Sequence, residues 1–126
     1  FLQTFTPLCV TRRKHIKFPY QAEKFSVARS SLMIPHPKGE TESIVGAFHE
    51  CSLGLHELNK KELDDNAKGL IAKLKDLMDT SGLTDPDGRG LWAVKAASLT
   101  TEQKFELSHV VDELAHWFDR HFWNNE

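Results

Sequence analysis

The sequence predicts an α+β fold, in which a short N-terminal antiparallel β-meander or hairpin packs on about three amphipathic helices. Short runs rich in β-branched and aromatic residues, separated by prolines, occupy residues 1–35. Apolar residues at helical spacing begin after residue 40. The 126 residues fit one domain, so we expect a single domain over 1–126, with an extended part over 1–35 and a helical part over 40–126.

The N-terminal part contains three candidate strands, at residues 8–11, 14–18 and 25–34. Prolines at positions 7, 19, 35 and 37 end or separate these runs. Residues 35–39 hold two prolines and a glycine, which can neither extend a strand nor enter a helix interior. We therefore expect a turn or linker there, between the extended and helical parts.

The first helix is expected over residues 40–58, with Thr41 as its N-cap. One face of this helix carries apolar residues at helical spacing, namely Ile44, Val45, Phe48, Cys51, Leu55 and Leu58. Gly46 and Gly54 each weaken a helix by about 1 kcal/mol relative to alanine. Another element should therefore pack closely on them.

The second helix is expected over residues 61–79, with Gly82 as the C′ residue that closes it. Its apolar stripe consists of Leu63, Ala67, Leu70, Ile71, Leu74, Leu77 and Met78. Residues 84–90 then form a turn-rich loop. The short apolar piece at 91–97 suits either a strand or a helical turn.

The last helix, over residues 101–123, has the clearest signal. Thr100 and Gln103 form a capping box at its start. Its broad apolar face consists of Leu107, Val110, Val111, Leu114, Trp117, Phe118, His121 and Phe122. A histidine in the position of His121 usually bonds a backbone carbonyl or a carboxylate through its ring nitrogens.

Composition indicates a globular protein of the cytoplasm. The apolar fraction of 40% and the charged fraction of 27% are ordinary for a folded domain. No apolar run approaches the roughly 20 residues that span a bilayer, so no membrane partner is expected. Residues 1–10 lack the basic leader and small-residue cleavage site of a secretory signal. Cys9 and Cys51 lie in apolar settings, so both are interpreted as reduced core residues.

Charge is distributed unevenly along the chain. Residues 1–40 carry seven basic and two acidic residues, whereas residues 41–126 carry nine and sixteen. Such asymmetry predicts either two faces that attract each other, within one chain or between two, or an arm that binds an acidic partner.

Histidines on the expected helices suggest a metal site as one hypothesis. The residues considered as ligands are His49, His56, His109 and His116. Glu106-x-x-His109 and Glu113-x-x-His116 have the spacing of di-iron carboxylate bundles, but both pairs lie on the polar face of one helix. A solvated face with helical ion pairs is the simpler interpretation, and no cofactor is expected.

Nucleic-acid binding is the second hypothesis. The residues that would carry it are Arg12, Arg13, Lys14 and Lys17, beside the aromatic residues Phe18 and Tyr20. No recognition-helix, RNP or zinc-finger pattern accompanies them, and the sequence pI is about 6.4. A basic edge strand, or a face opposed to the acidic helices, is the simpler interpretation.

Recognised catalytic and calcium motifs are missing from the sequence. There is no Gly-x-Ser-x-Gly elbow and no phosphate-binding glycine loop. Asp85-x-Asp87-Gly88 resembles part of an EF-hand loop, but Leu83 and Val94 stand where its first and last acidic ligands belong. The sequence therefore favours a protein that is not an enzyme.

The C-terminal aromatic cluster is the predicted partner-binding surface. It consists of Trp117, Phe118, Phe122 and Trp123. Tryptophan is a common anchor of protein association, although the same rings could instead cap the core. The sequence thus predicts a small cytosolic binding module that forms a homodimer through its last helix. A nucleic-acid-associated accessory protein is the first alternative, and a metal-dependent enzyme or sensor is the second.

Overall fold

The computed structural model describes residues 18–33, 39–56, 58 and 60–123. This part of the chain consists of helices joined by turns. The α-helices are α2 (Pro19–Met33), α3 (Glu40–Leu55), α4 (Asp65–Met78), α5 (Leu91–Ser98) and α6 (Thr101–Trp123), and a 3₁₀ turn, η1, spans Lys60–Glu62. None of these helices is long and apolar enough to cross a membrane.

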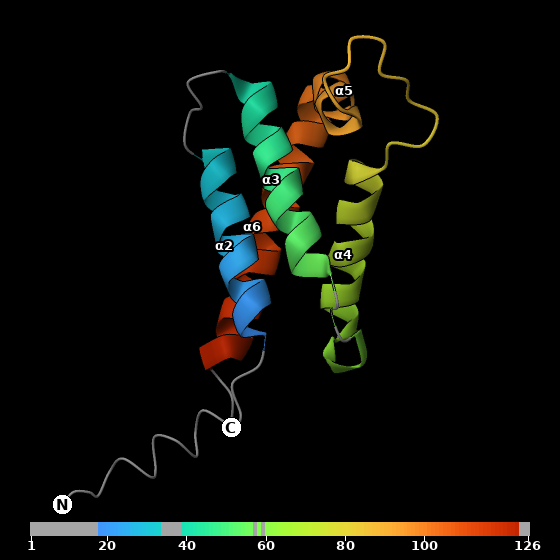
Figure 1. Ribbon diagram of the computed structural model, residues 1–126. Helices are drawn as coiled ribbons and strands as arrows, with labels where there is room; N and C mark the ends of the chain where they lie inside the picture. Colours follow the sequence, from blue (N-terminus) through green and yellow to red (C-terminus); the bar gives the residue numbers. More distant parts are fainter. Residues whose placement is uncertain (1–17, 34–38, 57, 59, 124–126) are drawn as a thin grey trace, which may run out of the picture.

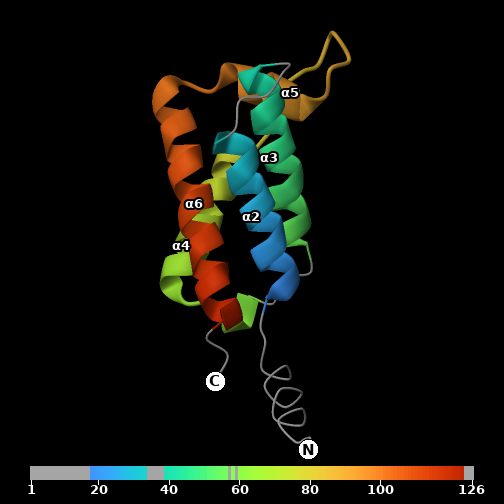
Figure 2. The ribbon, with the colours of Figure 1, turned by 90° about the vertical axis from the view of Figure 1, so that its left-hand side faces the viewer.

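The four longer helices form a bundle, with α5 lying across one end (Figure 1). Helix α2 packs on both α3 and α6, α4 packs chiefly on α6, and α5 packs on α3. Helices α2 and α6 run side by side in opposite directions and together form one side of the molecule (Figure 2). The start of α2 therefore lies near the end of α6.

The predicted β-meander is wrong, and with it the α+β fold class. The described residues contain no strand, and the expected strand at 25–34 lies mostly in α2. The expected strand at 8–11 and nearly all of the one at 14–18 lie outside the described residues.

Helix α2 was hidden in the sequence for two physical reasons. Pro19 is its first residue, where the fixed φ of proline favours a helix and the missing N–H would have no partner anyway. Helical periodicity is blurred because Tyr20, Val27 and Met33 are exposed while Phe25 is buried. The proline therefore begins a helix rather than ending a strand.

Helices α3 and α4 confirm the expected helices, with shifted boundaries. Helix α3 begins at Glu40 with Gly39 as its N-cap, so Thr41 lies inside it. The side chain of Asp64 caps α4 by accepting a hydrogen bond from the Ala67 N–H at 2.8 Å. Gly82 is not the C′ residue, because α4 already ends at Met78. Its φ of +78° instead serves a following turn.

The structure of residues 84–100 can be compared with the expected loop, the short apolar piece and the capping box. Asp85 organises the loop by accepting hydrogen bonds from the N–H groups of Arg89 and Gly90. The piece expected as a strand or a helical turn is helix α5. The capping box before α6 is confirmed, since Thr100 Oγ1 accepts from Gln103 N–H at 3.1 Å and Gln103 Oε1 accepts from Thr100 N–H at 2.8 Å.

A single hydrophobic core joins the helices. Its largest fully buried side chains are Trp117, Phe25, Phe48, Phe118, Leu74, Leu107, Leu114, Val110, Val111 and Cys51. The expected close packing occurs at Gly54, where an added Cβ would lie 2.9 Å from the Phe25 ring. Glycine at this position lets α2 approach α3 closely. At Gly46 the neighbouring atom is at an ordinary contact distance.

Candidate functional site

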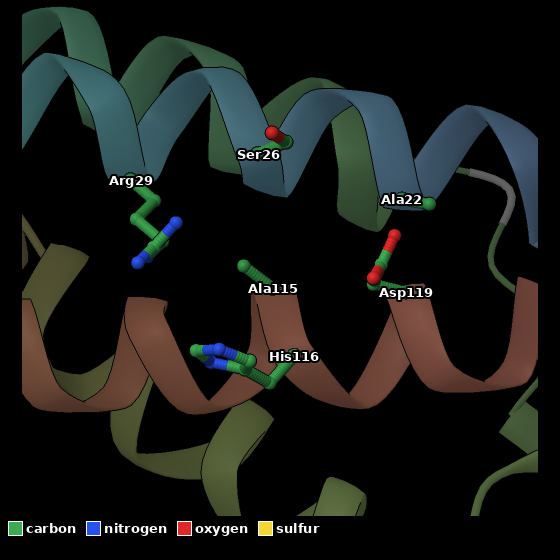
Figure 3. A pocket seen from close by; sticks show the side chains of 6 residues that line it. All are labelled: Ala22, Ser26, Arg29, Ala115, His116 and Asp119. Carbon is green, nitrogen blue, oxygen red and sulfur yellow. The ribbon is translucent and has the colours of Figure 1, made fainter.

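A hollow lies between α2 and α6 on the outside of the bundle. Its volume is about 170 Å³, and it is lined by Ala22, Ser26, Arg29, Ala115, His116 and Asp119 (Figure 3). Three of these residues come from α2 and three from α6. The small side chains of Ala22, Ser26 and Ala115 leave the space between the two backbones unfilled, so the groove follows from the residue sizes at the helix contact.

An ion pair crosses this groove. Arg29 Nε donates a 2.6 Å hydrogen bond to Asp112 Oδ1. In Figure 3, the Arg29 side chain extends from α2 toward α6, and Asp119 extends from α6 toward α2. Both members of the pair remain partly exposed, so the bond is screened by water and orients the side chains more than it stabilises the bundle.

His116 completes the polar part of the groove. Its Nδ1 lies 2.9 Å from the carbonyl oxygen of Asp112 and 3.5 Å from Asp112 Oδ1. Because a carbonyl only accepts, Nδ1 is the donor, which leaves Nε2 with its lone pair in the neutral imidazole. Donors and acceptors thus lie next to each other in an open hollow, an arrangement suited to a polar contact with a partner.

Two exposed apolar side chains extend this surface. Met33 follows Arg29 by four residues on α2, and Phe105 precedes Asp112 by seven on α6. Residues at these spacings share one side of a helix. Because α2 and α6 run in opposite directions, Met33 and Phe105 lie at the same end of the groove. We call the whole surface the α2/α6 face, formed by Ala22, Ser26, Arg29, Met33, Phe105, Asp112, His116 and Asp119.

A second hollow, of about 280 Å³, lies along α4. It is lined by Leu63, Lys68, Ile71, Ala72 and Lys75. Its walls come from α4 and from Leu63, two residues before this helix, and the charged groups in its lining are both lysines. It therefore lacks the mixture of acid, base and imidazole that the α2/α6 face brings together.

Of the four residues of the predicted aromatic surface, the structure describes the side chains of two. Trp117 and Phe118 are buried, and the Phe118 ring lies between Phe18 and Phe25, with centroids 5.3 and 5.2 Å away. These two residues belong to the core, the alternative that the sequence left open. The side chains of Phe122 and Trp123 lie outside the described part of the chain.

Trp117 also connects α6 to the start of α4. Its indole Nε1 donates a 3.1 Å hydrogen bond to Asp64 Oδ2. The hydrogen bond from the Ala67 N–H, and then that from Trp117, hold the pKa of the Asp64 carboxyl below its ordinary value. His121 stacks on Trp117 at 3.8 Å, and its Nδ1 bonds the Trp117 carbonyl, as expected for a histidine on the apolar side of a helix.

The histidines considered as metal ligands are dispersed over α3, its C-cap and α6. His49 lies on α3, where its ring is 6.5 Å from that of Trp92, and His56 follows the last residue of α3. His109 and His116 lie on the exposed side of α6. Within the described ranges, no three His, Cys, Asp or Glu side chains are arranged to hold a metal ion.

Most of the residues considered for nucleic-acid binding lie outside the part of the chain that the structure describes. Arg12, Arg13, Lys14 and Lys17 are among residues 1–17. The Phe18 ring is buried against Trp117 and Phe118, so base stacking would require it to leave the core. Tyr20 is exposed, and the Lys24 ammonium group lies 5.2 Å from its ring centre.

Cys51 is a core residue, as expected for this position, whereas Cys9 lies outside the described residues. Burial, assisted by the nearby charge of Glu50, raises the pKa of the Cys51 thiol to about 12. The thiolate is the reactive form of cysteine. At neutral pH the Cys51 thiol is therefore protonated and buried.

Sequence reasoning missed the Arg29–Asp112 pair. It placed Arg29 in a strand, which gave no reason to set this residue opposite α6. The available signal was the spacing of Ala22, Ser26 and Arg29, which is that of one side of a helix. Comparison with protein-family models, curated proteins and solved structures finds no match to this chain.

Proposed function

We propose that this chain is a non-enzymatic binding module that forms a homodimer through its α2/α6 face. The observation that carries the proposal is the exposure of Met33 (67%) and Phe105 (72%) at one end of a groove. They are the most exposed of the large apolar side chains that the structure describes. Covering such a side chain completely is worth about 1.5–3 kcal/mol, which gives association a driving force.

The polar centre of the face supports a symmetric contact. A two-fold interface presents the same residues from both copies, so each donor can meet an acceptor of the other copy. Arg29 supplies donors, Asp112 and Asp119 supply acceptors, and Nε2 of the neutral His116 ring is a further acceptor, all on this face. Polar groups of both kinds can therefore be satisfied when two such faces meet.

We place this function in the cytoplasm. The buried free thiol of Cys51 supports that setting, because reducing compartments keep cysteines unpaired. The proposed contact differs in residues from the one expected at the tip of the last helix, since Trp117 and Phe118 already serve the core.

Light scattering coupled to size exclusion tests the proposal over protein concentrations of about 1 to 100 µM. We expect the mass to rise from the 14.4 kDa of one chain toward twice that value. Phe105→Glu should weaken association at least tenfold, because it places a charge in the contact. A mass that stays at one chain throughout this range would overturn the proposal.

The matched control is Leu91→Glu. Leu91 is also apolar and exposed (41%), but it lies on α5, away from the α2/α6 face. This variant should associate like the unmodified protein. Equal loss of association in both variants would show that any added charge disrupts the dimer, so the α2/α6 face would not be the contact.

A further inference from the structure

Helix α4 is less covered than the other long helices of the bundle. Among the described residues, α4 packs chiefly on α6, whereas α2, α3 and α6 each pack on two helices. The hollow of about 280 Å³ lies along α4, and none of the described residues that line it comes from another α-helix. The side of α4 that carries the hollow is thus open to a ligand.

The apolar part of this hollow is aliphatic. Leu63 and Ile71 belong to the hydrophobic core and supply its floor. Ala72 is exposed and lies between Lys68 and Lys75 on the same side of the helix, so its small side chain leaves space between two long ones. None of the described lining residues is aromatic, so no ring is offered for stacking. Such a lining favours an alkyl chain over a planar ligand.

Both charged groups of the lining are cations. Lys68 and Lys75 are separated by about 10 Å along α4, at the helical rise of about 1.5 Å per residue. The acidic residues of α4 and its N-cap, which are Asp64, Asp65 and Asp76, are not among the residues found in the lining. The hollow therefore combines an aliphatic floor with positive charge, a combination that selects a ligand both apolar and anionic.

From this combination we propose that the hollow binds a free, straight-chain fatty acid of medium length. The alkyl tail lies against Leu63, Ile71 and Ala72, and the carboxylate binds the ammonium groups of Lys68 and Lys75. The flexible four-carbon stems of the two lysines let both ammonium groups turn toward one carboxylate. The volume of about 280 Å³ is just below the range of about 300–1,000 Å³ that is typical of small-molecule sites, so a single short chain suits it.

Titration of the ¹⁵N-labelled full chain with octanoate, below its micelle concentration, tests the proposal through amide chemical shifts. We expect saturable shifts centred on residues 63–75. The Kd should fall about fourfold with each methylene added from hexanoate to octanoate, because each methylene buried in the hollow contributes a similar free energy. Shifts that spread over the chain without saturation, or a Kd that does not depend on chain length, would overturn the proposal.

Two variants separate the roles of charge and shape. Lys68→Glu combined with Lys75→Glu should weaken octanoate binding at least tenfold, because acidic groups then face the carboxylate. Ala72→Leu should weaken binding by a similar factor, because the longer side chain fills the hollow while both lysines remain. Ala72 is exposed and leucine favours a helix, so this variant keeps the fold. Unchanged binding in either variant would remove octanoate from the hollow.

The matched control is Lys73→Glu. Lys73 is exposed on α4 but is not among the residues found in the lining, so this variant should bind octanoate like the unmodified protein. A loss of binding equal to that of the Lys68 and Lys75 variant would reduce the effect to net charge and contradict a site in the hollow.

Two further probes decide the class of ligand. Octyltrimethylammonium carries an alkyl tail of the same length with the opposite charge, and it should bind at least tenfold more weakly than octanoate. Vesicles of phosphatidylglycerol should not retain the chain in a flotation assay. Retention that is abolished by the combined Lys68→Glu and Lys75→Glu variant would assign the hollow to a membrane surface and overturn the proposal.

This inference is independent of the proposed self-association, because the hollow shares no residue with the α2/α6 face. Phe105→Glu should therefore leave the Kd for octanoate unchanged. A chain that stays monomeric but binds octanoate in the hollow would overturn the proposed function alone, and a dimer that does not bind octanoate would overturn this inference alone.

Discussion

Helix α6 packs mainly on α2 and α4, and it is joined to these two helices by different means. The contact with α2 is aromatic on the inside, where Phe118 packs between Phe18 and Phe25. The contact with α4 includes a hydrogen bond from Trp117 to Asp64, beside buried aliphatic residues such as Leu74. Helix α6 is thus joined to α2 by packed aromatic rings, whereas its contact with α4 includes a hydrogen bond to Asp64, the N-cap of α4.

The difference explains where the surface groove forms. Large rings between α2 and α6 keep the two helices apart on the inside of the bundle, while Ala22 and Ala115 are too small to fill the outside. A hollow results, and Arg29 reaches across it to Asp112. The groove is therefore a consequence of how the core is packed.

The largest effect should come from removing a core side chain on each side of α6. Phe118→Ala should lower the free energy of unfolding by about 3–5 kcal/mol, because it leaves a cavity where a ring contacted two others. Leu74→Ala should cost about 2–4 kcal/mol, since a smaller group is lost. Urea denaturation measures both. A larger loss for Leu74→Ala would contradict the view that the aromatic contact dominates.

An intermediate effect is expected from the link between α4 and α6. Asp64→Ala should cost about 1 kcal/mol, because α4 loses its N-cap. The pKa of Asp64 is lowered in the folded protein from its ordinary 3.8, so its charge stabilises the fold above about pH 4. This contribution is lost as the pH falls through the lowered pKa.

The variant Asp64→Asn removes the charge and the acceptor of the Trp117 Nε1 hydrogen bond, while its amide oxygen can still cap the helix. Its stability should change less with pH below about 4 than that of the unmodified protein. Thermal unfolding across this acidic range measures the difference. Parallel pH profiles for the two proteins would show that the Asp64 carboxylate does not contribute.

The smallest effect belongs to the ion pair across the groove. Arg29→Met and Asp112→Asn should each change the free energy of unfolding by less than about 1 kcal/mol, because both side chains are partly exposed. A double-mutant cycle should give a coupling of about 0.2–1 kcal/mol that decreases at high salt. A coupling free energy of several kcal/mol would contradict this expectation, because the ion pair would then stabilise the fold as much as a core side chain does.

The helices after residue 40 were predictable because their apolar residues follow a helical period. Helix α3 starts where expected but ends at Leu55. The start of α4 shifted to Asp65, since capping by Asp64 was not evident from spacing. Helix α2 was not predicted, because Val27 and Met33 are apolar but exposed. Hydrophobicity alone could not show which side of this segment is buried.

The α2/α6 face could be predicted only in part. The exposed side of α6, with His116 and Asp112, follows from its clear period. The opposite wall requires α2 to be a helix, for which the spacing of Ala22, Ser26 and Arg29 is the one local signal, and to lie antiparallel to α6, which local spacing does not encode. Trp117 and Phe118 were ambiguous for a related reason, since an aromatic residue serves a core and an interface equally well.

The buried thiol of Cys51 offers a measure of how fast this bundle opens. With a pKa of about 12 and no exposed surface, it reacts with a thiol reagent only when the core around α3 opens. In a Cys9→Ser background, the labelling rate of Cys51 would therefore report the frequency of core opening. Comparing that rate at low and high protein concentration would show whether association slows the opening of each subunit.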